Sequence, residues 1–441
     1  MALTKIGTDG IKDDAVTSDK VANAINSSIA ANTAKDLTAL SAANLTSGTI
    51  PDARFPATLP TASAANLTAV PAANITGTLP AISAANLTNV PAANITGTLP
   101  AISGANLTNL PASGKATNFV INGAMNVAQY GSSFTNISNT GVIGSVDRMV
   151  MVGANLDEFA FAGKQTSDGP DGFKKCFEVD VTTAENALDA NDLAYIRYKI
   201  EGQDLVPLFN ANGTGKNFVI SFYVKAYQAG TYQLNIYKPT GTRFISKTYT
   251  IASSGVWQRI EIPFTGDTNT SGINDDTSAG LNIAWMLVAG TDYTSAGVLP
   301  NWGGWPGNSG FAGGQAVNVA SSTDNYFRIT GIQLEIGDTA SDFAHEDYAT
   351  TLAKCQRYYF KETATTFPAT GYGTNASTNC LGVLGQFCTM RATPTITLGN
   401  ASYWGSGPTV GGQSPSYSYV YGTASVSNGP RIAGYELSAE L

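Results

Sequence analysis

Apolar and polar residues alternate in several short segments of the region 115–350. A period of two predicts strands that bury one face and expose the other. Gly230 separates the first two of these segments, so we expect the two to form a hairpin. Many short strands with turns between them, and little helix, predict a β-sandwich of the jelly-roll type. The clearest segments are 218–224, 232–236, 260–264 and 281–287.

The alternation changes phase once, within segment 326–336. Phe327 and Ile329 lie two positions apart, but the next apolar residue of the series is Ile332, three positions on. One extra residue in a strand restores the pattern when it is accommodated as a β-bulge. The sequence therefore predicts a bulge near Thr330 and Gly331.

The N-terminal residues 1–35 are polar apart from one apolar stripe. Val21, Ile25 and Ile29 recur every four residues, which predicts one face of a helix. A single helix of this length cannot bury such a stripe by itself. We therefore expect this segment to dock on another protein through these three residues.

Residues 36–114 form a repeat with a period of 20. Segments 71–80 and 91–100 are identical, and 51–60 is a diverged copy. A fixed period indicates a linear array, and its regular prolines exclude long helices and central strands. Each repeat has too few large apolar residues for a core of its own. We predict a shaft of identical chains sealed along a thin apolar seam; the alternative is a disordered linker. The seam residues of one repeat are Leu67, Val70, Ile75 and Leu79.

The last region, 351–441, becomes rich in Gly, Ser, Thr and Tyr, and segment 435–441 alternates as a terminal strand does. We predict a small β domain at the tip of the molecule. The expected fold class is thus mainly β, with a short helical segment, a repetitive shaft, a jelly-roll head and a tip. The predicted boundaries are 1–35, 36–114, 115–350 and 351–441.

Charge and composition narrow the possible partners. The chain of 441 residues has 24 basic and 32 acidic residues, a net charge of −8. This argues against nucleic acid and against anionic membrane surfaces, both of which require a basic surface. With His345 as the only histidine, a His-based triad and a metal site with two imidazoles are nearly excluded.

The sequence also indicates where the chain folds. It has no apolar run long enough for a transmembrane helix and no secretory signal. Its few cysteines are scattered, which predicts reduced thiols rather than a disulfide framework. We expect folding in a cytoplasm, without membrane insertion. The cysteines are Cys176, Cys355, Cys380 and Cys388.

Several segments resemble bacteriophage tail fibre proteins, especially those of cyanobacterial phages. The most specific are Ile-Gln-Leu-Glu-Ile-Gly at 332–337 and Cys-Gln-Arg-Tyr-Tyr at 355–359, and the shaft repeat at 45–56 is also similar. Asp147-Arg148 resembles the start of a fibre head, although the family usually has an aromatic residue where Met149 stands. Segment 257–264 resembles jelly-roll carbohydrate-binding modules.

This resemblance implies a homotrimeric tail fibre of a virion, made in the host cytoplasm. The N-terminus would bind phage tail or adaptor proteins, and the distal part would bind a host surface glycan. The family resemblance implies attachment rather than catalysis. A glycan-cleaving tailspike depolymerase and a purely structural fibre remain alternatives.

The loop 290–314 is the most unusual stretch of the head. It carries large rings among many glycines, and long irregular connections are often functional. Aromatic faces can stack on sugar C–H groups, while neighbouring polar side chains bond hydroxyls. The alternative is that the rings pin the loop to its own sandwich or lie at a subunit contact. The candidate carbohydrate-binding residues are Trp302, Trp305, Tyr293, Asp292 and Asn301.

Other candidate sites carry weaker signals. The acidic residues Glu178, Asp180, Glu201 and Asp204 include pairs that a glycosidase could use, but an acidic chain offers many such pairs. Calcium could bind near Asp189, Asn191 and Asp192 or near Asp275 and Asp276, although neither segment has a full calcium-loop pattern. We expect no cofactor, core positions for Trp257 and Trp285, and packing roles for the tip residues Trp404, Tyr417, Tyr419 and Tyr421.

Overall fold

The structure is a computed structural model in which the chain divides into two units, Met1–Ile102 and Ser103–Leu441. The residues it describes are 23, 25–28, 30, 117–131, 133–135, 142–143, 145–363, 367–368, 379–384, 388–402, 404, 407–423 and 431–441. The described residues of the first unit are helical, and Ile25 is 52% exposed there. Val21, Ile29 and the whole predicted shaft lie outside the described residues.

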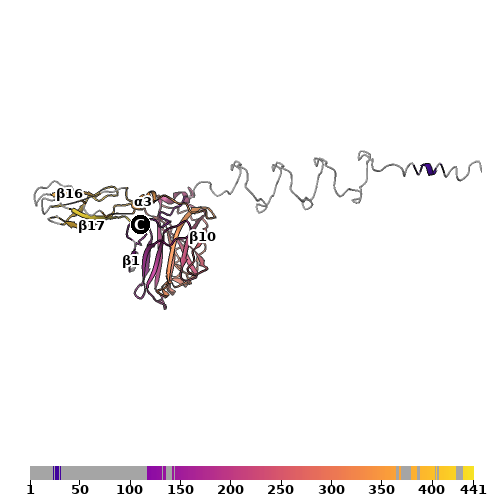
Figure 1. Ribbon diagram of the computed structural model, residues 1–441, viewed down its shortest axis with the longest axis horizontal. Coiled ribbons are helices and arrows are strands. Elements are labelled where there is room, and N and C mark those ends of the chain that lie inside the picture. The colour runs from indigo at the N-terminus through magenta and orange to yellow at the C-terminus, as the bar shows by residue number, and fades with distance from the viewer. Residues whose placement is uncertain are drawn as a thin grey trace, which may run out of the picture. The chain divides into compact units, whose positions relative to one another are not determined.

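Two antiparallel sheets form the sandwich, and Figure 1 shows the strands of this region. The first sheet has the order β1 (Ser133–Thr135), β4 (Ala160–Thr166), β5 (Cys176–Thr183), β13 (Tyr326–Ile336), β7 (Phe218–Ala226) and β10 (Gln258–Phe264). The second has the order β12 (Gly303–Gly304), β9 (Arg243–Ile251), β8 (Gly230–Lys238), β11 (Ala279–Ala289), β6 (Leu193–Glu201), β3 (Val150–Ala154) and β2 (Val142–Ile143). The predicted mainly β fold with a sandwich is confirmed.

The chain crosses repeatedly from one sheet to the other, and this corrects one prediction. β7 and β8 do not form a hairpin, because β7 pairs with β10 and β13 while β8 pairs with β9 and β11. Gly230 adopts φ +148° and begins β8, which is a strand of the opposite sheet. Alternation shows that each strand buries one face, but it does not show which strand is its partner. The hairpin of this region is β8–β9.

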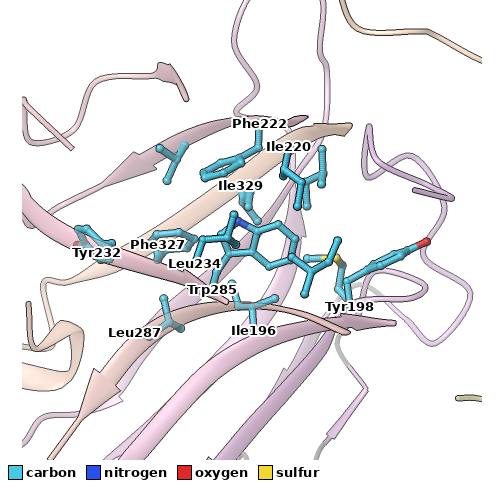
Figure 2. Packing of buried hydrophobic residues seen from close by; sticks show 14 of the residues in the cluster. Ile196, Tyr198, Ile220, Phe222, Tyr232, Leu234, Trp285, Leu287, Phe327 and Ile329 are labelled. Carbon is cyan, nitrogen blue, oxygen red and sulfur yellow. The ribbon is translucent and has the colours of Figure 1, made fainter. Parts of the chain in front are cut away.

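The core lies between the inner faces of the two sheets. Trp285 of β11 is completely buried, and its ring meets that of Phe222 of β7 edge-on at 5.9 Å. Figure 2 shows Trp285 surrounded by apolar side chains of both sheets, among them Ile196, Leu234 and Ile329. Each such side chain contributes about 1.5–3 kcal/mol by leaving water, so this layer supplies most of the driving force for folding. Trp285 is a core residue as predicted, whereas Trp257 is only half-buried.

The predicted bulge is present in β13. Its register against β7 shifts between Thr330 and Gln333, and Gly331 adopts φ +62°. A Cβ atom on Gly331 would come within 3 Å of the Phe173 and Tyr223 rings. Glycine is therefore required here both by its positive φ and by the close approach of these rings.

The C-terminal region begins with a capped helix. In α3 (Tyr348–Gln356), the Asp347 carboxylate accepts a hydrogen bond from the Thr350 backbone N–H at 2.9 Å. One sheet follows with β14 (Tyr359–Glu362), β20 (Arg431–Ser438), β15 (Phe367–Pro368) and β17 (Thr395–Ser402), and another with β16 (Asn379–Leu384), β19 (Ser418–Thr423) and β18 (Thr409–Gly411). The predicted terminal strand exists, but it starts at Arg431.

Ion pairs join the sandwich to the end of the chain. The buried Arg148 guanidinium lies 3.5 Å from the centre of the Tyr358 ring and 2.7 Å from the Glu440 carboxylate. Arg357 forms a bidentate ion pair with Glu201, in which Nε donates to Oε1 at 3.0 Å and Nη2 donates to Oε2 at 2.9 Å. Arg391 donates to the backbone carbonyls of three residues: Thr277, Ala439 and Glu440. No helix of the described residues is long and apolar enough to cross a membrane.

Candidate functional site

The loop that follows β11 folds back over the outer face of the second sheet. It contains α2 (Thr291–Thr294), β12 and a short 3-10 helix at Asn308–Gly310. Backbone hydrogen bonds hold it in place: Ala312 donates to Tyr293 at 2.9 Å, and Trp305 donates to Thr242 at 3.0 Å. β12 also pairs with β9. The glycine-rich loop is therefore an ordered lid on the sheet.

Polar side chains of β8 fix the position of this lid. Gln233 and Asn235 point out of the sheet, are buried beneath the loop, and both donate to the Phe311 carbonyl, at 2.9 and 2.7 Å. In addition, the Gln315 side chain of the lid accepts a hydrogen bond from the Gln233 backbone N–H at 3.0 Å. Buried amides that are satisfied in this way specify one arrangement of the loop.

A groove of about 290 Å³ remains between the lid and the sheet. Strands β6, β8 and β11 supply its floor, and the lid supplies one wall. We call it the aromatic groove. It is lined by Tyr195, Arg197, Asn235, Tyr237, Thr242, Asn282, Ala284, Trp305 and Phe311.

Its wall is a cluster of rings. Trp305 is 41% exposed, and its ring lies 5.3 Å from Tyr237 and 5.4 Å from Phe311 between centres. Phe244, which points outward from β9, supports Trp305 from below at 5.5 Å. Tyr195 meets Phe311 edge-on at 5.3 Å on the other side. The Trp305 indole is thus held by its neighbours while a large part of its surface stays accessible.

The floor is hollow because a small residue lies at its centre. Ala284 of β11 faces Asn235 of β8 on one side and Arg197 of β6 on the other. The next row of the same face consists of Tyr237, Asn282 and Lys199. Neighbouring strands are about 4.8 Å apart, so the two side chains that flank Ala284 are rooted roughly 10 Å from each other.

Two polar atoms of the groove are unsatisfied. The Nε–H of Arg197 and the Oδ1 of Asn282 are sheltered from solvent and have no hydrogen-bond partner among the described residues. Leaving such groups unpaired costs about 1–3 kcal/mol each. The Arg197 Nε–H is a charged donor, and the Asn282 Oδ1 is a neutral acceptor. A ligand that supplies an acceptor to the first and a donor to the second would therefore bind more tightly.

The residues predicted from the sequence fall into different surroundings. Trp305 lines the groove. Trp302 is half-buried against the sandwich core, and its Nε1–H donates to the Thr265 carbonyl at 2.7 Å. Tyr293 packs beneath the lid with Leu193 and Ala312. Asp292 and Asn301 are exposed and do not line the groove. The structure therefore brings one of the five to the groove and uses two others for packing.

The other groove residues lie on strands that sequence reasoning assigned only to the fold. Tyr195 and Arg197 occupy outward positions of β6, and Tyr237 occupies one of β8. An outward aromatic or arginine is unremarkable on one strand. These residues form a candidate site only because strand pairing places β6, β11 and β8 side by side beneath the lid.

The candidate acidic pairs are engaged in structural contacts. Glu178 lies on the first sheet and forms ion pairs with Arg328 and Lys164. Glu201 lies on the second sheet and is paired with Arg357. Asp180 accompanies Glu178 on β5, and burial together with the nearby Glu201 charge raises the pKa of Asp204. The ion pairs of Glu178 and Glu201 thus explain both glutamates as structural residues.

The suggested calcium segments are hydrogen-bonded turns. Asp192 accepts from the Asn155 side chain at 2.9 Å and from the Asp189 backbone at 2.7 Å. Asp276 accepts from the Ser278 backbone at 2.8 Å. Within the described ranges, no group of three or more His, Cys, Asp or Glu side chains is placed to hold a metal ion.

The remaining singled-out residues have packing contacts. His345 packs against the Phe173 and Phe343 rings at 5.0 and 4.9 Å. Trp404 donates through Nε1 to the Arg431 carbonyl at 3.2 Å. Tyr417, Tyr419 and Tyr421 form a row of rings with neighbouring centres 5.8 and 6.1 Å apart. Of the cysteines described with their side chains, Cys176 and Cys355 are buried and Cys388 is half-buried, and each is a free thiol.

Comparison with known proteins gives structural neighbours only. No family model matches the sequence, and no curated protein matches it. One neighbour is the enzymatically active domain of tailspike protein 4 from bacteriophage CBA120, at 13% identity and a TM-score of 0.26, over 50% of this chain and 21% of that one. The match thus spans about a fifth of the length of that domain.

Two further neighbours come from Clostridium thermocellum. A family 11 carbohydrate-binding module in complex with a β-1,3-1,4-mixed-linked tetrasaccharide shares 14% identity, with a TM-score of 0.24, over 48% of this chain and 99% of that one. The CBM22-1–GH10 modules of xylanase 10B, complexed with xylohexaose, share 11% identity, with a TM-score of 0.21, over 50% of this chain and 30% of that one. No groove residue is assigned a role from these similarities.

Proposed function

We propose that this chain is a non-enzymatic glycan-binding protein and that the aromatic groove is its binding site. The observation that carries the proposal is the position of Trp305: its ring is immobilised by Tyr237, Phe244 and Phe311, yet remains 41% exposed over a hollow floor. Large rings are normally buried when a fold needs them only for packing. A rigid, accessible indole beside unsatisfied polar atoms matches the chemistry of a sugar, which has apolar C–H faces and hydroxyl edges.

The geometry favours a ligand that enters from the side and rests on the sheet. Ala284 leaves room above the floor, Trp305 offers a stacking surface, and Asn282 offers an acceptor for a hydroxyl. Binding sites of this kind are mostly preformed clefts with a few placed polar groups. Because the lid is tied down by Gln233 and Asn235, little ordering is required on binding, which preserves affinity.

In the organism, we propose that the chain acts as a phage tail fibre that attaches the virion to a host surface glycan. The support is the resemblance of segments 332–337 and 355–359 to tail fibres, together with the 20-residue repeat, which we predict to form a shaft with partner chains. The fibre would be a homotrimer, and its N-terminal stripe would dock on the tail. Three grooves on one particle would then act together, and avidity raises affinity by about 10² to 10⁴ when the spacing fits.

A substitution at the floor of the aromatic groove tests the proposal. In Ala284→Leu the added methyl groups fill the hollow without changing an aromatic or charged residue. Binding of the full-length chain to an array of host-type oligosaccharides should fall at least tenfold. Because Ala284 is itself buried beside Met286 and Ala312, thermal unfolding is measured to establish that the variant is folded at the assay temperature. Thr250→Leu is the matched control, because Thr250 is exposed on the same face of the same sheet, outside the groove. Equal binding by both variants would place the site elsewhere.

A further inference from the structure

The aromatic groove differs from the rest of the molecule in its charge. The chain as a whole is acidic, with a net charge of −8. Yet the groove lining contains Arg197 and, within the described part of the chain, no Asp or Glu. Lys199 follows two positions later on the same strand and therefore points to the same face. An acidic protein has thus kept a local positive site next to its exposed tryptophan.

Arg197 also differs from the other arginines of the sandwich. Arg148, Arg243, Arg259 and Arg328 each form an ion pair with a carboxylate. For Arg197 and Lys199 no ion pair is found in the described ranges. The Arg197 side chain shares a hydrogen bond with Tyr195, but its Nε–H has no acceptor among the described residues. A guanidinium is costly to bury without a counter-ion. Among the arginines of the sandwich in the described ranges, the one found without a carboxylate partner is therefore Arg197, which lines the groove.

The pKa of Lys199 also indicates positive charge beside the groove. Burial and, after it, the positive charges of Arg197, Arg391 and Arg148 together lower the pKa of Lys199 to about 8. The negative charge of Glu440 raises the pKa of Lys199, but its contribution is the smallest of these. Glu440 forms its ion pair with Arg148. Positive charge around the end of β6 is thus incompletely neutralised by the protein itself.

The chemistry of a guanidinium specifies what would satisfy it. Nε–H and a neighbouring terminal N–H form a planar fork that matches the two oxygens of a carboxylate or two oxygens of a sulfate. The donor on the far side of Ala284 is an amide, Asn235, which is already bonded to the lid. The fork of Arg197 is therefore the strongest recognition element that the groove offers.

We propose that the glycan bound in the aromatic groove is acidic, with a carboxylate or sulfate group on Arg197, a hydroxyl that donates to Asn282 and a sugar face on Trp305. This inference rests on the proposed function and specifies its ligand class. Lys199, one row along the floor, adds longer-range attraction. A neutral glycan would leave the Arg197 Nε–H unpaired and would bind more weakly.

The test compares acidic glycans with their own neutral forms. The full-length chain is titrated on an array that holds oligogalacturonates, sulfated galactans and neutral galactans, and on the same oligogalacturonates after reduction of the carboxyl groups to alcohols. Arg197→Gln, Arg197→Lys and Lys174→Gln are measured alongside. Lys174→Gln is the matched control: it removes the same charge from an exposed position outside the groove. Thermal unfolding establishes that each variant is folded.

We expect the wild-type chain to bind at least one acidic series ten- to a hundredfold more tightly than the neutral glycans. Arg197→Gln should lose that preference, Arg197→Lys should keep part of it, and Lys174→Gln should keep all of it. Equal binding of acidic and neutral forms would overturn the acidic ligand and leave glycan binding intact. Equal losses in Arg197→Gln and Lys174→Gln would overturn it too, because they would indicate general charge attraction. No binding to any glycan would contradict the proposed function itself.

Discussion

Trp302 and Trp305 are three residues apart in one loop, and the structure gives them opposite roles. Trp305 faces the aromatic groove, whereas Trp302 anchors the lid to the sandwich through its contact with the core and its hydrogen bond to Thr265. Replacing each by alanine should therefore separate binding from stability. This matched pair tests the site directly.

The magnitudes follow from the surroundings of each ring. Truncation of a fully buried Trp costs about 3–5 kcal/mol, so a half-buried one should cost about half of that. For Trp302 the lost hydrogen bond adds about 1 kcal/mol, and we expect a total of about 2.5–3.5 kcal/mol. In a domain of this size, that lowers the melting temperature by about 5–10 °C. Below that temperature, Trp302→Ala should bind glycan like the wild type.

For Trp305 the distinguishing effect should be on binding. A central aromatic contact that loses about 2 kcal/mol on truncation weakens binding about 30-fold. By the same scaling its stability cost should be about 2 kcal/mol, because 41% of the side chain is already in water, so the variant should remain folded at 20 °C. Glycan binding at 20 °C, measured on the full-length chain, and thermal unfolding distinguish the two variants. Loss of binding in folded Trp302→Ala, with normal binding in Trp305→Ala, would refute the assignment of the groove.

Three further outcomes are expected. Sedimentation of the full-length protein should give an elongated particle of three times the 45.7 kDa chain mass, and a stable compact monomer at micromolar concentration would contradict the shaft argument. Glu440→Gln should cost about 3 kcal/mol, because it leaves the buried Arg148 without its counter-ion, and an unchanged unfolding curve would show that the pair is dispensable. Burial raises the pKa of Asp147 to about 6 against the bonds that it accepts from Gln129. Since the folded pKa exceeds the usual value of 3.8, this residue stabilises the fold most at low pH; its contribution should fall by up to about 3 kcal/mol between pH 4 and 6. The fall should be absent in Asp147→Asn, and an identical pH profile in that variant would refute it.

The sequence alone determined the strands and their buried faces. Alternation located β7, β10 and β11, and a one-residue change of phase located the bulge at Gly331, because a strand must keep one face toward the core. It also indicated that the loop 290–314 is unusual. Local patterns carry this information because side-chain direction depends only on position along a strand.

The tertiary structure decided everything that depends on which strands are neighbours. β7 and β8 show the alternation of a hairpin but belong to opposite sheets, since each has the same apolar pattern whether its partner follows it or lies far along the chain. The aromatic groove exists because pairing places Arg197 beside Ala284 and brings the lid with Trp305 above them. These residues are up to about 100 positions apart, and no local pattern relates them. The same long-range packing separated Trp302 from Trp305, which the sequence had treated as equivalent.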